Sequence, residues 1–165
     1  MAKTKDKIYE SADTMRPYVD RALHDDDLHD ASSAYFKVEG KPMAVLCHGT
    51  VGLQHATMAV YNAYCDRVPV FILAGNHLDA AERGGSVEWQ HSVQDAAALV
   101  RDFVKWDDTP ASLGHFAESA VRAYKIAMTP PMGPVYVCLP QDVLDEVATE
   151  EVFPTSLPIT YSLPA

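Results

Sequence analysis

The sequence has few cysteines, no long apolar run and no excess of positive charge, and each shortage argues against a class of protein. Its three cysteines (Cys47, Cys65 and Cys138) are isolated in apolar or helical contexts, which favours reduced thiols in an intracellular compartment. No apolar run reaches the roughly 18 residues that a membrane helix needs. Residues 1–15 also lack the apolar centre of a secretory signal. We therefore expect a cytoplasmic protein with no membrane partner.

The charge balance points away from nucleic acid. The chain contains 13 Lys and Arg residues against 23 Asp and Glu residues, and its formal net charge is -10. This charge repels a phosphate backbone and favours solubility. With 165 residues, 48% of them hydrophobic, the chain has the size and composition of one globular domain with a sizeable core.

The middle of the sequence alternates between short apolar runs and an amphipathic segment. "MAVLCH" (43–48) is a continuous apolar run bounded by turn residues, the pattern of a strand buried on both faces. Residues 51–64 carry apolar side chains on one helical face, and "RVPVFILAGN" (67–76) supplies the next buried strand. This order of strand, turn, helix and strand predicts a βαβ unit.

The second half of the sequence continues the alternation. A short helix runs into a predicted strand at "FVKW" (103–106), and a helix follows with Thr109 as its cap and Pro110 in its first turn. A last buried strand lies within "PPMGPVYVCLPQDV" (130–143). We therefore predict an α/β fold with a doubly wound, mainly parallel sheet flanked by helices. Such sheets bind ligands at the carboxyl ends of their strands, where His48 and Asn76 fall.

The two ends of the chain differ from this pattern. Residues 1–30 are charged and helical in pattern, which is atypical of an α/β domain. We expect a helix from about Arg16 to about Phe36 that ends before Gly40. Residues 31–145 form the predicted α/β domain. Residues 146–165 contain proline and threonine without periodicity and are typical of a linker or tail.

Two local patterns suggest other chemistry. In "HDDDLHD", Asp25 and His29 share a helical face and could bind a divalent metal, but a solvated charge run explains the same pattern, and we predict no metal site. Cys47 beside His48 suggests a nucleophilic thiol, yet alternation along a strand would point the two side chains to opposite faces. Each cysteine is instead interpreted as a small buried apolar residue.

Three blocks carry a family resemblance. They are "AYFKVEGKPMAVLCHGTVGLQHATMAVYNAYCDRVPVFILAGN", "HSVQDAAALVRDFVKW" and "GPVYVCLPQDV", in that order along the chain. Together they resemble the pyrimidine-binding (PYR) domain of thiamine diphosphate enzymes of the acetolactate synthase and benzoylformate decarboxylase type. The resemblance covers residues 34 to 143. The cofactor that it implies is thiamine diphosphate.

The resemblance assigns catalytic roles to two residues. The family's glutamate, which hydrogen-bonds the aminopyrimidine and activates the cofactor, falls on Asp25, one methylene shorter. The family's glycine before Tyr35 is Ala34 here, a second departure. His48 matches the histidine that benzoylformate-type decarboxylases place over the substrate carbonyl, where it can donate or accept a proton.

The resemblance also implies binding residues. The turn whose backbone faces the cofactor pyrimidine comprises Gly49, Thr50, Val51 and Gly52, and His55 falls where many relatives carry an asparagine. Gln90 or His91 lies near the region where relatives contribute a further active-site polar residue that faces substrate.

Other family features are missing from this sequence. The family binds diphosphate through Mg²⁺ at a "GDG…N" segment of a separate PP domain, which the chain lacks. The family's first strand and its glycine-rich loop are also unrecognisable. The resemblance therefore implies a PYR domain or subunit of a 2-oxo acid decarboxylase or carboligase that is active only with a PP-domain partner, which would hold the Mg²⁺. The alternative is a non-catalytic, truncated or degenerate PYR-like domain that acts in dimerisation or assembly. The expected partners are further copies, as a dimer or a dimer of dimers, or a PP-domain subunit.

Overall fold

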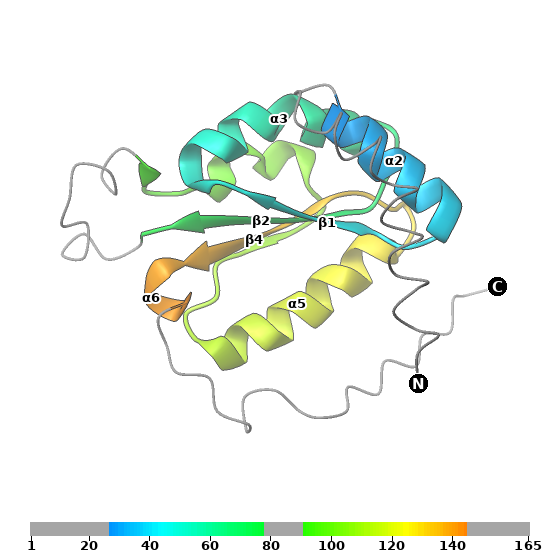
Figure 1. Cartoon of the computed structure of the whole chain (residues 1–165). Coiled ribbons are helices and arrows are strands. Elements are labelled where there is room, and N and C mark those ends of the chain that lie inside the picture. The colour runs from blue at the N-terminus through cyan, green and yellow to red at the C-terminus, as the bar shows by residue number, and fades with distance from the viewer. Residues whose placement is uncertain (1–26, 78–90, 145–165) are drawn as a thin grey trace, which may run out of the picture.

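A computed structural model describes residues 27–77 and 91–144 of the chain. The described residues form one parallel sheet of four strands, in the order β1-β2-β4-β3, with helices between the strands (Figure 1). The elements are α2 (Asp27–Glu39), β1 (Met43–Cys47), α3 (Gly49–Cys65), β2 (Val70–Asn76), the 3₁₀ turns η1 (Ala97–Leu99) and η2 (Arg101–Phe103), β3 (Asp107–Asp108), α5 (Leu113–Met128), β4 (Val135–Pro140) and α6 (Gln141–Leu144). The predicted doubly wound parallel α/β fold is confirmed. No helix in the described ranges is long and apolar enough to cross a membrane.

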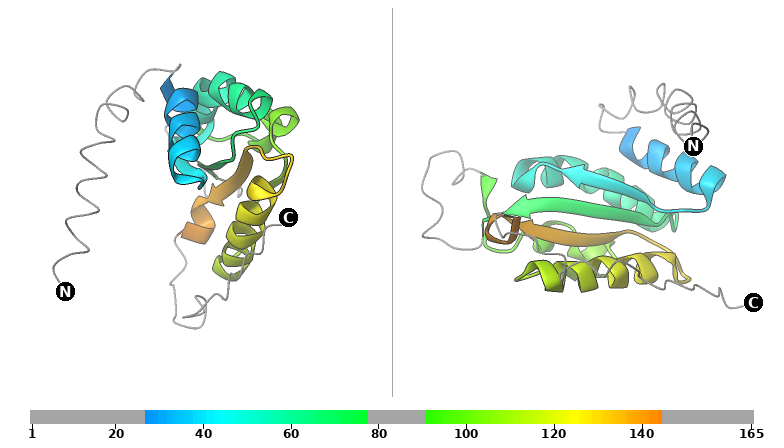
Figure 2. Two further views of the ribbon diagram at one scale, coloured as in Figure 1. Left: turned by 90° about the vertical axis from the view of Figure 1, so that its right-hand side faces the viewer. Right: turned by 60° about the horizontal axis from the view of Figure 1, so that its bottom comes forward.

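Helices cover both faces of the sheet. Figures 1 and 2 show α2 and α3 on one side and α5 on the other. The larger apolar core lies under α3, where Leu53 and Val60 pack with Ile72 and Tyr136 of the sheet. A smaller core lies under α5 and includes Ala123, Ala127, Val135 and Val137. Because β4 contributes fully buried side chains to both cores, every residue from 135 to 138 is buried.

Strand β1 is only half buried, and the prediction of burial on both faces was wrong. Among the described residues β1 pairs with β2 alone, so it lies at the edge of the sheet. Met43, Val45 and Cys47 are partly buried, whereas Ala44 and Leu46 are exposed, Leu46 by 74%. Alternating side chains point to opposite faces, and α5 packs mainly against β4 and β2. The sequence pattern did not distinguish an edge strand from a central one.

The helix ends agree only in part with prediction. Helix α2 continues to Glu39, three residues past the predicted end, and Gly40 follows with φ of 66°, a conformation that favours glycine. The part of the predicted helix before residue 27 lies outside the described residues, and α2 crosses the predicted boundary between residues 30 and 31. Helix α5 is capped by Ser112, whose hydroxyl accepts from the His115 N–H at 3.2 Å. Thr109, the predicted cap, lies outside the helix.

The segment before β3 contains two 3₁₀ turns in place of the predicted short helix. Val100 separates them with φ of −132° and ψ of −1°, which interrupts a regular helix. Arg101 donates to Asp95 at 2.7 Å and to Asp107 at 3.2 Å, joining this segment to the start of β3. The same guanidinium holds the pKa of Asp95 below its usual range. Strand β3 comprises residues 107 and 108, just beyond the predicted 103–106.

A lysine stabilises the carboxyl end of α5. The Lys105 ammonium donates to the carbonyl oxygens of Ile126 and Thr129, which are among the last acceptors of that helix. We expect Lys105→Met to lower the free energy of unfolding by about 1–3 kcal/mol, because both carbonyls lose a charged donor. Urea denaturation would measure the change. Lys37→Met, on an exposed position of α2, is the control and should change it by less than about 0.5 kcal/mol; an equal loss in both variants would contradict the role of Lys105.

Candidate functional site at the carboxyl ends of the strands

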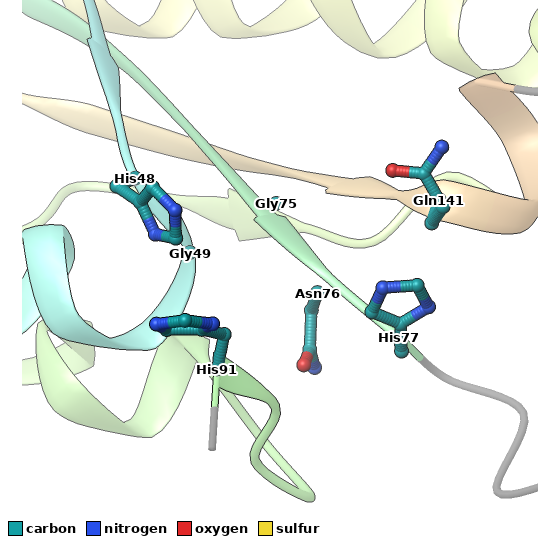
Figure 3. Close-up of a pocket in the computed structure, with 7 residues that line it drawn as sticks. All are labelled: His48, Gly49, Gly75, Asn76, His77, His91 and Gln141. Atoms are coloured by element: carbon teal, nitrogen blue, oxygen red, sulfur yellow. The ribbon is translucent and has the colours of Figure 1, made fainter. Parts of the chain in front are cut away.

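A pocket of about 310 Å³ lies where the carboxyl ends of β1, β2 and β4 meet, at the place that the fold class predicts. Figure 3 shows its lining residues, which come from the strand ends and from the segment before η1. They are His48, Gly49, Gly75, Asn76, His77, His91 and Gln141. Among the described residues, the lining therefore combines three imidazoles with two amides and contains no carboxylate.

His48 lies between β1 and α3 and is exposed at the pocket. It occupies the cap position of α3 with extended backbone, and its side chain makes no capping hydrogen bond. A Cβ at Gly52 would lie 3.0 Å from the His48 Cβ, so the glycine gives the histidine room within the first turn. The imidazole is thus placed beside the first turn of the helix without being used to cap it.

His91 faces His48 across the pocket mouth. The two ring centroids are 4.7 Å apart with an interplanar angle of 63°, an edge-to-face contact (Figure 3). The buried Thr50 hydroxyl donates to the His91 carbonyl oxygen at 2.8 Å. The first turn of α3 therefore fixes the backbone that carries the second imidazole.

Asn76 holds the next part of the same segment. Its side-chain amide donates to the Val93 carbonyl oxygen at 2.9 Å, and its carbonyl oxygen accepts from the Val93 N–H at 3.1 Å. Asn76 is only 4% exposed, so both hydrogen bonds are shielded from water. Together, Thr50 and Asn76 attach the segment 91–93 to the first turn of α3 and to the end of β2.

Gly49 allows backbone carbonyl groups of two neighbouring segments to lie close to the start of α3. A Cβ at position 49 would lie 3.1 Å from the carbonyl oxygen of His91 and 3.2 Å from that of Gly75. Both neighbours are backbone atoms, so a methyl group at position 49 would require one of them to shift by a few tenths of an ångström. Packing therefore favours glycine at the helix start.

The structure brings some of the predicted site residues together and not others. His48, Gly49 and His91 line one pocket, and Thr50 supports it through a hydrogen bond. Val51 and His55 are exposed on α3 and are not among the lining residues, and Gly52 contributes space rather than a lining surface. Asp25 and Gln90 lie outside the described residues.

Sequence reasoning missed His77 and Gln141 as lining residues. Each directly follows the end of a buried strand, His77 after β2 and Gln141 after β4. Figure 3 shows them across the pocket from His48 and His91. His48 was selected because it is a polar residue at the carboxyl end of a parallel strand. The same rule would also have selected His77 and Gln141.

Other chemistry finds little support here. The described ranges contain no group of three or more His, Cys, Asp or Glu side chains that could hold a metal ion. Burial raises the pKa of the Cys47 thiol, which disfavours a reactive thiolate. Cys138 is buried as predicted, but Cys65 is exposed near the end of α3, so its interpretation as a buried apolar residue was wrong.

The sequence model of the family described as "Thiamine pyrophosphate enzyme, N-terminal TPP binding domain" matches residues 5–99. The chain belongs to this family. The match covers more than half of the chain and begins upstream of the resemblance noted from the sequence, within the segment 1–30. The predicted relationship to acetolactate synthase and benzoylformate decarboxylase is confirmed by the relatives below.

Similar proteins place this family domain among decarboxylases and synthases. Acetolactate synthase of Bacillus subtilis (strain 168) is 26% identical over 142 residues, which cover 86% of this chain and 24% of that protein. Benzoylformate decarboxylase of Pseudomonas aeruginosa is 28% identical over 120 residues, 73% of this chain and 22% of that protein. The solved thiamine diphosphate-dependent 4-hydroxybenzoylformate decarboxylase of Rhodococcus jostii RHA1 superposes with a TM-score of 0.66 and 28% identity, over 79% of this chain and 24% of that one. This thiamine pyrophosphate enzyme domain thus spans less than a quarter of the length of these relatives.

Proposed function

We propose that the chain supplies the pyrimidine half of an interface active site in a thiamine diphosphate-dependent 2-oxo acid decarboxylase or carboligase. The observation that carries this proposal is the pocket of a family N-terminal domain with His48 exposed at its mouth, beside the glycine turn of α3. The similar proteins, an acetolactate synthase, a benzoylformate decarboxylase and a 4-hydroxybenzoylformate decarboxylase, support the same reaction class.

The residues present fit one half of the cofactor. Gly49 is among the lining residues, and its missing side chain lets the start of α3 lie close to the carbonyl oxygens of His91 and Gly75, which narrows the pocket around a flat ring. The volume of about 310 Å³ is at the lower end for small-molecule sites, consistent with a ring rather than a whole cofactor. Mg²⁺ prefers oxygen ligands that include carboxylates and binds diphosphate through its remaining positions, and the described part of the chain has no such cluster of carboxylates. We therefore assign diphosphate and Mg²⁺ binding to a PP-domain partner.

When bound, thiamine diphosphate supplies a nucleophilic carbon and an electron sink for the oxo acid. His48 donates or accepts a proton at the substrate carbonyl oxygen, because its imidazole is exposed and unused as a cap. His91 orients the His48 ring and faces substrate from the other side of the pocket mouth. Asp25, outside the described residues, is the proposed acid that contacts the pyrimidine.

The catalytic activity of this chain depends on the partner that it binds. A PP-domain subunit, or further copies in a larger assembly, would complete the site in the cytoplasm. The rival is a PYR-like domain that has kept the fold and serves only in assembly. The aligned part of this chain covers 24% of the length of acetolactate synthase, and this short span fits either case.

Calorimetric titration with thiamine diphosphate and Mg²⁺ tests the proposal, first with the chain alone and then with a PP-domain partner. We expect binding with the partner, and a loss of affinity of at least about tenfold for Gly49→Ala, because the new methyl group meets two backbone carbonyls. Gly114→Ala is the matched control, since nothing lies within 4 Å of a Cβ there. Absence of binding with every PP-domain partner tried would favour the assembly role.

A further inference from the structure

Strand β1 forms an unprotected edge of the sheet. Among the described residues it pairs with β2 alone, so alternate backbone N–H and C=O groups on its other side face no strand. Natural proteins protect such edges with charged side chains, proline or bulges. Residues 43–47 read MAVLC, and their register with β2 is continuous from Met43 to Cys47, so β1 contains none of these features. An edge of this kind pairs readily with a further strand.

An apolar surface lies along the same edge. Val45 and Cys47 pack on the core under α3. Ala44 and Leu46 therefore point to the opposite face, where α5 packs mainly against β4 and β2. Leu46 is 74% exposed. A strand added beside β1 would satisfy the backbone groups, and apolar side chains on its α5 face would cover Leu46.

The last residues of the chain have the sequence of such a strand. Residues 146–165 lack helical periodicity, but at steps of two they contain an alternation that their interpretation as a linker overlooked. Residues 157–163, defined here as the tail strand, contain an apolar series of Leu157, Ile159, Tyr161 and Leu163. The residues that alternate with this series are Pro158, Thr160, Ser162 and Pro164. Such alternation is typical of a half-buried strand. Residues 152–165 also include no charged side chain, whereas 22% of the whole chain is charged.

The prolines fit an edge strand in one orientation. Successive residues of a strand turn their backbone groups to opposite sides, so if the apolar series pairs with β1, Pro158 and Pro164 face solvent, where a missing N–H costs no hydrogen bond. A right-handed crossover through α3 turns the backbone groups of Ala44 and Leu46 away from β2. Residues directly opposite in an antiparallel pair lie on the same face. The apolar series would therefore lie beside Leu46 on the α5 face.

The chain can reach this edge in the required direction. Helix α6 directly follows β4 and ends at Leu144, at the carboxyl end of the sheet (Figure 1). The position beyond β1 lies three strand spacings from β4, about 15 Å, and residues 145–156 can span up to roughly 40 Å. A strand that enters from this end runs antiparallel to β1. Antiparallel edge strands are common on otherwise parallel sheets.

Other occupants fit the edge less well. Residues 1–26 carry charged side chains throughout and have a helical rather than an alternating pattern. A second copy or a separate protein must bind from solution, whereas the tail strand is covalently attached and has a high effective concentration. We propose that the tail strand pairs with β1 as an antiparallel edge strand, with its apolar series on the α5 face. The inference is independent of the proposed function, because its tests need neither cofactor nor partner.

Amide hydrogen exchange in the full chain, followed residue by residue by NMR, tests the pairing. The amides of Ala44 and Leu46 should be protected in the wild-type chain. Ile159→Asp should accelerate their exchange by at least about tenfold, because a charged residue of low strand propensity replaces an apolar one in the tail strand. Ser156→Asp is the matched control, since it places the same charge just before the tail strand and should leave both rates unchanged. The Val45 amide, on the β2 side, is the internal reference.

Three results of this experiment would overturn the proposal. Fast exchange at Ala44 and Leu46 in the wild-type chain would show that the edge is open. Protection that persists in Ile159→Asp would show that another segment, such as residues 1–26, covers it. Protection that rises with protein concentration would show that a second copy occupies the edge.

Disulfide cross-linking tests the face and the direction of the tail strand. Leu46→Cys combined with Ile159→Cys or Tyr161→Cys should give an intramolecular disulfide under mild oxidation, identified by mass spectrometry of the digested chain. Leu46→Cys with Thr160→Cys is the control and should give none, because residue 160 lies on the other face. The residue that links to Ala44→Cys should lie two positions after the one that links to Leu46→Cys. A partner two positions earlier would indicate a parallel strand, and either that result or no link from 159 and 161 would contradict the arrangement.

Discussion

Replacing Asn76 by aspartate is expected to lower the free energy of unfolding by about 2–4 kcal/mol. The substitution keeps an acceptor for the Val93 N–H but removes the donor to the Val93 carbonyl oxygen, and it places a negative charge at a position that is 4% exposed. A loss of this size corresponds to a decrease of roughly 5–15 °C in the unfolding midpoint. The deficit should shrink at acidic pH, because a protonated carboxyl group can again donate to Val93.

Thermal unfolding followed by circular dichroism at two pH values would measure this effect. Gln94→Glu is the matched control, because it makes the same change from amide to acid on an exposed side chain nearby. It should shift the midpoint by no more than about 2 °C. Hydrogen exchange at the Val93 amide adds a local measurement, and faster exchange in Asn76→Asp is expected. Equal midpoints for the two variants would show that the Asn76 hydrogen bonds contribute little.

The second large effect is expected on catalysis. With a PP-domain partner and thiamine diphosphate, His48→Ala should lower kcat by about 10²–10⁴-fold, the range for loss of a proton-transferring group. The affinity for thiamine diphosphate should stay within about threefold, because His48 faces the proposed substrate side of the pocket. His48→Gln, which can hydrogen-bond but cannot transfer a proton in this range, should be nearly as impaired.

Measurements of stability distinguish this loss of kcat from a folding defect. His48 is exposed and its side chain does not cap α3, so neither variant should unfold earlier than the wild-type chain. His115→Ala is the control for loss of an imidazole elsewhere: it removes a contact of 3.1 Å with Asp108 on the α5 side and should leave kcat unchanged. Full activity in His48→Gln would reassign His48 from proton transfer to hydrogen bonding.

The sequence predicted the location of the candidate pocket better than the contacts that build it. Alternating apolar runs placed His48 and Asn76 at strand ends, because strand direction follows from the βαβ order. The partners of Asn76 could not be predicted, since Val93 is distant in sequence and the contact depends on where the segment before η1 returns to the sheet. His91 could be placed near the site only through the family resemblance, and its contact with His48 required the structure.

Element types were predictable, whereas edges and caps were not. Apolar runs identified β1, β2 and β4. The composition of β1 does not reveal that, among the described residues, this strand has a neighbouring strand on one side only. Thr109 and Ser112 are both capable caps, and the hydroxyl of Ser112 is the one that meets the His115 N–H. Such choices between equivalent residues depend on backbone direction, which is set by tertiary packing.

The position of β4 in the sheet has a consequence during protein synthesis. β4 is the last of the four described strands along the chain, yet it lies between β2 and β3. A nascent chain that has released β1 and β2 from the ribosome therefore has a sheet of only two strands, which is rarely stable, and its Phe71 and Leu73 lack the partners that β4 and α5 later supply. This sheet therefore completes only after residues 135–140 emerge, and a chaperone that binds apolar segments can act on β1 and β2 until then.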